Sequence, residues 1–110
     1  MEIVKVTVIN EMGLHARPAA VFVQTANRFK SQIKVRNLTK NSITSDARSI
    51  LGVLVLGVEK NHMIELEING EDEKSAAACL QKLIESDFAQ ANDTVGQSGD
   101  GSGKPVERNK

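Results

Sequence analysis

Tryptophan and tyrosine are absent from the sequence, and only three of its 110 residues are phenylalanine. Proteins that bind single-stranded nucleic acid stack bases on aromatic side chains, so this composition argues against such a surface. The charges argue the same way, because 14 basic and 14 acidic residues leave no net charge to attract a phosphate backbone. No nucleic-acid partner is therefore expected. Hydrophobic residues still make up 40% of the chain, which predicts one globular domain with an aliphatic core.

Cysteine is limited to Cys79, which excludes an internal disulfide. Its place in a helical pattern predicts a partly buried small side chain. No residues have the spacing of metal ligands and no P-loop lysine motif is present, so neither a metal nor a cofactor is expected. The N-terminus lacks the apolar core of a signal peptide, and no stretch is long enough to span a bilayer. These absences predict a soluble cytoplasmic protein without membrane insertion, and we expect a monomer.

Apolar patterns divide residues 1–88 into alternating and helical segments. Val4, Val6 and Val8 share one phase, as in a strand with one buried face. The predicted order is a strand at 4–8, a helix from the 13–20 segment to about Arg28, strands at 33–36 and around Ile43, a short helix from about Arg48 to Leu54, a strand at 63–68 and a helix ending near Phe88. This β-α-β-β-α-β-α order predicts a two-layer α/β (α+β) sandwich in which three helices cover one face of the sheet.

The composition changes from Asn92 onward. Residues 96–103 are composed of glycine, serine, glutamine and aspartate, and the residues after them are mostly charged or polar. Such a composition is typical of flexible linkers rather than of a packed core. We therefore expect a folded domain at 1–88 and a disordered C-terminal tail at 89–110.

The segment Gly13–Ala20 places His15 immediately before a predicted helix. An unperturbed imidazole changes charge near neutral pH and can act as a nucleophile. The first turn, Ala16–Pro18, offers free backbone amides and the positive end of the helix dipole, both of which favour a phosphate. Arg17 adds a planar fork of donors, and Pro18 loses no hydrogen bond in a first turn. The segment predicts an imidazole that holds a phosphoryl group transiently, although a His-x-Arg-Pro segment alone also suits a histidine that only faces solvent.

A second segment of interest begins at Ser49, which follows helix-start residues and is placed to cap the short helix. Residues 49–58 carry no charge. Val53 and Leu56 suit the buried side of this helix. Its outer side is left with three apolar residues, Ile50, Leu51 and Leu54. Exposed apolar side chains either mark a partner surface or close the edge of the core.

Together the two segments resemble those of HPr, the histidine-containing phosphocarrier family of the bacterial phosphoenolpyruvate-dependent phosphotransferase system. Gly13–Ala19 is similar to the family's active-site signature. Ser49–Val53, followed by Leu56–Gly57, is similar to its serine-site signature. The resemblance covers about residues 1–88. It implies an open-faced sandwich with a four-stranded antiparallel sheet and three helices on one face.

The resemblance also implies a function. His15 is expected to accept a phosphoryl group on Nδ1 from phosphorylated enzyme I and to pass it to enzyme IIA domains in sugar uptake. Arg17 is expected to help hold and release the group, and such a carrier is not an enzyme. Ser49 matches a serine that HPr kinase/phosphorylase modifies in many members, but members without that kinase share the signature, so its regulation stays open. The positions matching enzyme I and enzyme IIA contacts are Ile50, Leu51 and Leu54.

Three other functions are compatible with parts of this pattern. A regulatory paralogue of the nitrogen branch would use the same histidine. A small hydrolase of the acylphosphatase kind would also bind phosphate with an arginine near a helix, but it needs an asparagine to position water. A regulatory binding domain would leave His15 inert. His62, in the loop before the last strand, is expected to be a surface histidine without a partner, and it has no metal-ligand spacing with His15.

Overall fold

The alternating valines at the N-terminus form strand β1, Glu2–Thr7, in the computed structural model, which describes residues 1–89. Three further strands pair with it, β2 (Gln32–Asn37), β3 (Ser45–Asp46) and β4 (Met63–Asn69). The sheet order is β1-β4-β2-β3, and every pairing is antiparallel. The predicted four-stranded antiparallel sheet is therefore confirmed.

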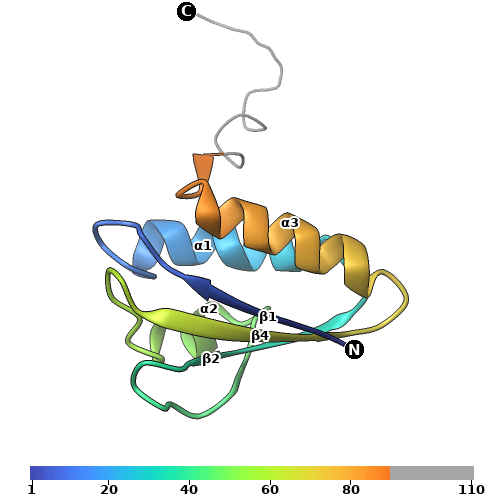
Figure 1. The fold of residues 1–110 in the computed structure, drawn as a ribbon, viewed down its shortest axis with the longest axis horizontal. Helices are drawn as coiled ribbons and strands as arrows, with labels where there is room; N and C mark the ends of the chain where they lie inside the picture. The colour runs from blue at the N-terminus through green and yellow to red at the C-terminus, as the bar shows by residue number, and fades with distance from the viewer. Residues whose placement is uncertain (90–110) are drawn as a thin grey trace, which may run out of the picture.

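Three helices complete the fold, α1 (Ala16–Ala26), α2 (Ile50–Leu54) and α3 (Glu73–Glu85). The two longer helices, α1 and α3, lie side by side over one face of the sheet (Figure 1). The short α2 contacts α1 and β3. The opposite face of the sheet stays open, and its charged side chains are in register across the strands, as in Lys5, Glu65 and Arg36. The observed element order and the two-layer open-faced sandwich agree with the prediction.

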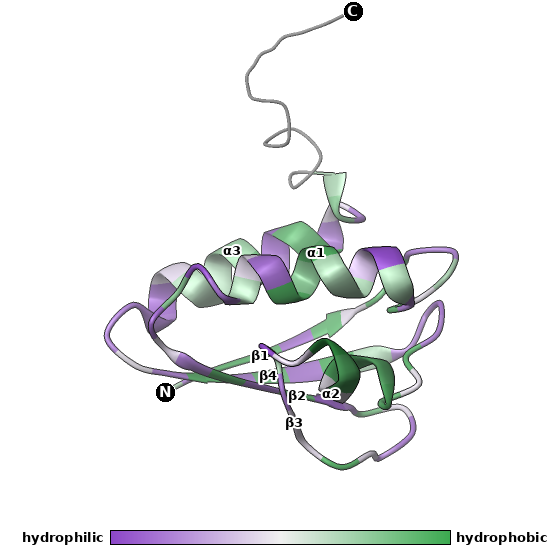
Figure 2. Cartoon of the chain, turned by 180° about the vertical axis from the view of Figure 1, so that it is seen from behind, coloured by the Kyte–Doolittle hydropathy of each residue, from purple (hydrophilic) through white to green (hydrophobic). Residues whose placement is uncertain are grey.

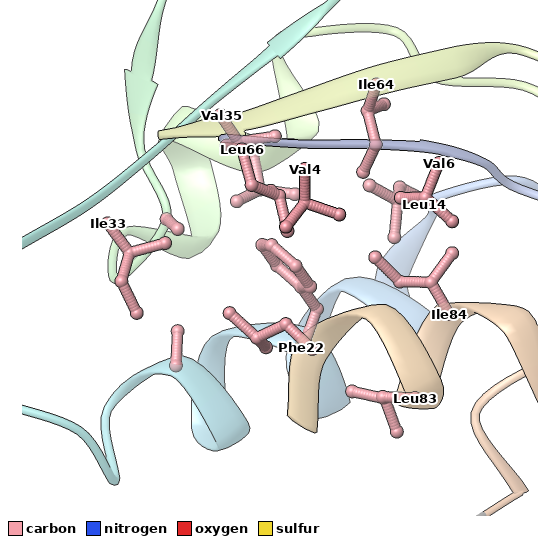
Figure 3. Packing of buried hydrophobic residues seen from close by; sticks show 14 of the residues in the cluster. Val4, Val6, Leu14, Phe22, Ile33, Val35, Ile64, Leu66, Leu83 and Ile84 are labelled. Atoms are coloured by element: carbon pink, nitrogen blue, oxygen red, sulfur yellow. The ribbon is translucent and has the colours of Figure 1, made fainter. Parts of the chain in front are cut away.

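Phe22 is the largest fully buried side chain. Its ring points from α1 toward Val4 of β1 and Leu66 of β4 (Figure 3). The other large side chains that are fully buried are leucine, isoleucine and valine, as expected for a chain with only three phenylalanines. Burying a side chain of this size stabilises the fold by about 1.5–3 kcal/mol, so Phe22 is a principal link between the helical layer and the sheet.

The strand expected around Ile43 is wrong in position. Ser42 closes a loop instead, because its N–H donates to the Asn37 carbonyl at 3.0 Å and its Oγ accepts from the Asn37 N–H at 2.8 Å. Strand pairing resumes only where Ser45 faces Val35. Ile43 lies before that point and is 72% exposed. The β2–β3 hairpin thus exists, with a longer connection than its apolar residue suggests.

The last helix is also shorter than predicted, since it ends at Glu85 rather than near Phe88. Asp87 and Phe88 take left-handed backbone angles, with φ of 56° and 65°. The Phe88 N–H then donates to the Leu83 carbonyl at 2.7 Å. This turn folds the Phe88 side chain back into the core, where it is 4% exposed. An apolar residue at the end of a helical pattern therefore belongs here to the turn that stops the helix.

The remaining predictions concern Cys79, the C-terminal tail, membrane-spanning helices and metal ligands. Cys79 is half-buried, as its helical phase predicts. Apart from Ala89, the predicted tail at 89–110 lies outside the described residues. Within residues 1–89, no helix combines the length and hydropathy that a bilayer crossing needs. In the same part of the chain, no three His, Cys, Asp or Glu side chains gather as metal ligands would.

Candidate functional site

His15 is the N-cap residue of α1, and it is exposed. Its backbone is extended, with φ −91° and ψ −165°, and its carbonyl accepts the first helical hydrogen bond from the Ala19 N–H at 2.8 Å. The imidazole makes no capping hydrogen bond. The serine, threonine, aspartate and asparagine side chains that usually occupy this position would cap an amide of the helix. Here the side chain is left for another partner.

The first turn of α1 also has backbone amides, and the Arg17 side chain, that can bind an anion. The amides of Ala16 and Arg17 have no acceptor within the helix, because the first N–H groups of any helix lack one. Pro18 is the third helical residue, a position where its missing N–H breaks no helical hydrogen bond. No acidic residue occupies this turn, and among residues 1–89 no ion pair involves Arg17. The positive end of the helix dipole is therefore uncompensated and lies beside a cation.

The loop before His15 is held by the segment that follows α2. The Leu14 N–H donates to the Val58 carbonyl at 2.9 Å. Gly13 takes a left-handed φ of 68°, and a Cβ at this position would lie 2.3 Å from the Val58 oxygen and 2.6 Å from the Glu59 Cα. Only glycine fits this close approach of two backbones. The position of His15 consequently depends on residues more than 40 places along the chain.

Ser49 is the N-cap of α2, as predicted, and it is exposed. Its Oγ accepts from the Gly52 N–H at 3.1 Å. A Cβ on Gly52 would lie 3.3 Å from the Ser49 Cβ and Oγ, so the glycine leaves room for the cap. The hydroxyl therefore has a structural role in α2 whether or not it is modified.

The outer side of α2 is apolar. Ile50 and Leu54 are each 37% exposed and Leu51 is 71% exposed, whereas the predicted core residue Val53 is fully buried. Val55 was not predicted to belong to this side, and it is 69% exposed. Val55 stands four residues after Leu51, and that helical spacing could have indicated it. Figure 2 shows α2 as a nearly continuous hydrophobic segment. We call these four residues, Ile50, Leu51, Leu54 and Val55, the α2 surface.

His62 is not the unpartnered surface histidine that was expected. It is half-buried, and its Nδ1 accepts from the Glu59 N–H at 3.1 Å. The same Nδ1 lies 3.1 Å from the Nδ2 atom of Asn37, a fully buried residue at the end of β2. Asn37 is 25 positions away in the sequence, so no local pattern indicates the contact.

Comparison with known proteins gives these features a family. Residues 4–86 match the family model described as "PTS HPr component phosphorylation site", which covers most of the chain. The chain belongs to the HPr family. HPr proteins are phosphocarriers of the phosphotransferase system, and the uncapped helix start at His15 lies within the matched region.

Individual HPr proteins are similar over nearly their whole length. The phosphocarrier protein HPr of Neisseria meningitidis is 41% identical over 85 residues, which cover 77% of this chain and 92% of the relative. The crystal structure of HPr-C-His from Thermoanaerobacter tengcongensis has 45% identity and a TM-score of 0.75, and the match covers 80% of this chain and 96% of that one. An HPr-like segment also occurs in a larger protein, since the multiphosphoryl transfer protein of Haemophilus influenzae is 41% identical over 78 residues, 16% of its length and 71% of this chain.

Proposed function

We propose that this chain carries a phosphoryl group on His15, which accepts the group from phosphorylated enzyme I and passes it to enzyme IIA domains. The observation that carries the proposal is the exposed imidazole at the uncapped start of α1, next to Arg17. Membership in the HPr family supports the assignment. We propose the cytoplasm as the place of this transfer, in line with the family's role.

In the proposed uptake step, the lone pair on Nδ1 of neutral His15 attacks the phosphorus atom. A nitrogen–phosphorus bond forms, the donor's bond to phosphorus breaks, and the electrons of that bond leave with the donor. The amides of Ala16 and Arg17 and the positive end of α1 favour the negative charge on the phosphoryl oxygens. The Arg17 guanidinium adds a mobile donor for the same oxygens. The second step is the same displacement, with an enzyme IIA side chain as the acceptor.

This site suits a carrier better than an enzyme that turns over a small substrate. One helix start and one arginine favour a phosphoryl group without enclosing it. The sequence has no P-loop lysine motif that would cradle the phosphate more fully. The likeness to part of a multiphosphoryl transfer protein supports a role within a chain of transfers between proteins.

Incubation with enzyme I and labelled phosphoenolpyruvate tests the proposal. The wild-type chain is expected to take up acid-labile, base-stable phosphate, and His15→Ala is expected to take up none. Arg17→Ala should slow uptake by about a hundredfold, the lower end of the range expected when one group that stabilises the transition state is removed. Arg28→Ala is the matched control, because Arg28 is also exposed but follows the other end of α1. Labelling of His15→Ala would show that the assignment is wrong.

The α2 surface is proposed as the docking site for enzyme I and enzyme IIA. The Leu14–Val58 hydrogen bond supports this, since it fixes the segment following α2 against the His15 loop. Leu51→Glu is expected to weaken binding of enzyme I at least about tenfold, as the loss of an apolar contact in an interface does. Ile3→Glu is the control, because Ile3 is 57% exposed but lies on β1. Equal weakening by both variants would contradict the proposed surface.

We further propose that Ser49 is the residue modified by an HPr kinase. Its exposure and its place at a helix N-terminus support the proposal, because a phosphate there is electrostatically favoured. Incubation with ATP and an HPr kinase should give acid-stable phosphate on the wild-type chain and none on Ser49→Ala. Acid-stable phosphate on both would place the modification elsewhere.

A further inference from the structure

We propose that Asn37, which is fully buried, and His62, which is half-buried, form a pair that positions the His15 loop and α2 relative to each other. This inference rests on the proposed carrier function of His15. Both residues lie outside the phosphoryl site and outside the α2 surface, so we treat them as positioning residues. Their role follows from the hydrogen bonds that converge on them from three separate segments of the chain.

The protonation of the pair follows from its partners. A backbone amide can only donate, so the Glu59 N–H requires His62 Nδ1 to be an acceptor. The orientation of the Asn37 amide is set in the same way, because its Oδ1 accepts from the Lys40 N–H at 3.2 Å and its Nδ2 donates to the Leu56 carbonyl at 3.2 Å. Nδ2 therefore also donates to His62 Nδ1, whose single lone pair it shares with the Glu59 N–H. Nδ1 is thus the ring nitrogen of His62 that carries no proton in this arrangement.

One side of the pair leads to the His15 loop. His62 Nδ1 holds the Glu59 amide, and Glu59 is the residue whose Cα crowds Gly13. The neighbouring carbonyl, that of Val58, accepts from the Leu14 N–H directly before His15. The backbone of His62 adds a second link, because its carbonyl accepts from the Val8 N–H at 2.9 Å. A shift of the 58–62 segment would therefore move the start of α1.

The other side of the pair leads to α2. Leu56 comes two residues after the end of α2, and its carbonyl accepts from Asn37 Nδ2. The same amide group thus contacts the segment that ends α2 and the histidine that supports the His15 loop. Asn37 has no exposed surface, so water cannot replace these hydrogen bonds. One buried side chain couples the proposed docking surface to the proposed phosphoryl site.

Two substitutions of His62 separate this role from a general contribution to packing. In His62→Asn, the side-chain Oδ1 is bonded to Cγ as Nδ1 is and can accept both hydrogen bonds. In His62→Leu, a side chain of similar size has no acceptor, and the Glu59 N–H and the Asn37 amide lose a partner. Loss of the acceptor for the buried Asn37 amide is expected to speed local opening about tenfold.

The readouts are amide hydrogen exchange and the rate of phosphoryl uptake from enzyme I. In His62→Leu, exchange at Leu14 and Glu59 should be about tenfold faster, whereas exchange at Leu80 in α3 stays near the wild-type rate. Uptake on His15 should slow by a similar factor. His62→Asn should restore both rates. Wild-type behaviour of His62→Leu, or equal acceleration at Leu14 and Leu80, would overturn the inference.

Two further observations keep the test decisive. Long-range proton–nitrogen NMR of the wild-type chain should show an unprotonated Nδ1 on His62, and a proton there would contradict the pair even if the leucine variant fails to fold. If the wild-type chain takes up no phosphate, the carrier function fails by itself. Hydrogen exchange and the histidine tautomer would then still decide whether the pair positions the loop.

Discussion

The N-termini of α1 and α2 differ in whether a side chain caps their first amides. At α2, the Ser49 hydroxyl accepts from the Gly52 N–H, so the helix caps itself. At α1, His15 stands in the same N-cap position and caps nothing. The start of α1 is instead fixed from outside, by the Leu14–Val58 hydrogen bond. A helix start that is held by its neighbours can leave its own amides free for a phosphoryl group.

This contrast has an energetic consequence. An N-cap side chain contributes about 0.5–2 kcal/mol to stability, and α1 lacks that contribution. Proteins usually depart from locally optimal choices where function requires it. We therefore expect that a residue which caps α1 at position 15 raises the free energy of unfolding and removes the phosphoryl-carrier activity of His15.

The largest effect is expected from His15→Asp. Aspartate lacks the imidazole, so the base-stable phosphate on residue 15 should disappear, and any phosphate taken up on the new carboxylate would be a base-labile acyl phosphate. Its carboxylate can accept from the Arg17 N–H, because Pro18 at the next position has none, and it also complements the helix dipole. The free energy of unfolding in urea should therefore rise by about 1 kcal/mol.

His15→Ala is the control for this stabilisation. It should lose uptake as well, while its stability stays within about 0.5 kcal/mol of wild type. A marked loss of stability in His15→Ala would show that the imidazole supports the fold and that the two helix starts differ less than the structure indicates.

The next largest effect concerns the external support of α1. Gly13→Ala puts a Cβ against the Val58 carbonyl and the Glu59 Cα at a left-handed φ, so we expect a loss of about 3 kcal/mol in urea unfolding. Gly57→Ala is the matched control. It also has a left-handed φ, of 60°, but its Cβ would meet only the flexible end of Lys40, at 3.0 Å. It should cost only about 1 kcal/mol. Similar losses in both variants would mean that the crowding at Gly13 is unimportant.

The sequence predicts those features that depend on residues close together in the chain. The helix start at His15 and the cap at Ser49 depend on neighbouring residues, and both were predicted. The apolar side chains of Ile43 and Phe88 favour a strand around Ile43 and a helix that ends near Phe88, and the structure has neither. Their true positions depend on the Asn37–Ser42 hydrogen bonds and on the left-handed turn at Phe88. These contacts exist only once the chain has folded.

The Asn37–His62 contact shows the same limit within the candidate site. Each residue has an ordinary sequence context, and the pair arises because the end of β2 lies next to the loop before β4. Pairing of β2 with β4 brings the two segments together. Local sequence patterns do not indicate a contact between residues 25 positions apart, so residues that support a site are harder to predict than those that form it.

A smaller effect is expected at the capped helix. Ser49→Ala removes the acceptor for the Gly52 N–H, and the free energy of unfolding should fall by about 1 kcal/mol. Ser49→Asn keeps an N-cap acceptor and should restore most of that loss. If Ser49→Ala and His15→Ala change stability equally, the proposed difference between the two helix starts is wrong.

The smallest effect on the free energy of unfolding is expected at Asp72, directly before α3, and this effect should depend on pH. Asp72 is its N-cap, but its carboxylate reaches across to the segment before β2 instead of capping α3. Hydrogen bonds from the Ser31 hydroxyl and the Lys30 amide lower the pKa of the Asp72 carboxyl below its ordinary value of 3.8, and a further one comes from the Ser31 amide. A carboxyl whose pKa is lower in the folded state stabilises the fold above the unfolded pKa, and this contribution is lost as the pH falls through the folded pKa.

Asp72→Asn should therefore be slightly less stable than wild type at neutral pH, and the difference should shrink as the pH falls below about 3.8. Urea unfolding of both chains between neutral pH and pH 2.5 measures the change. Asp46→Asn is a suitable control, because Asp46 is exposed and accepts only locally, from the Arg48 N–H. A difference between Asp72→Asn and wild type that does not vary with pH would show that the carboxylate's charge is irrelevant. In that case the link from Asp72 to the segment before β2 would depend on its hydrogen bonds and not on its charge.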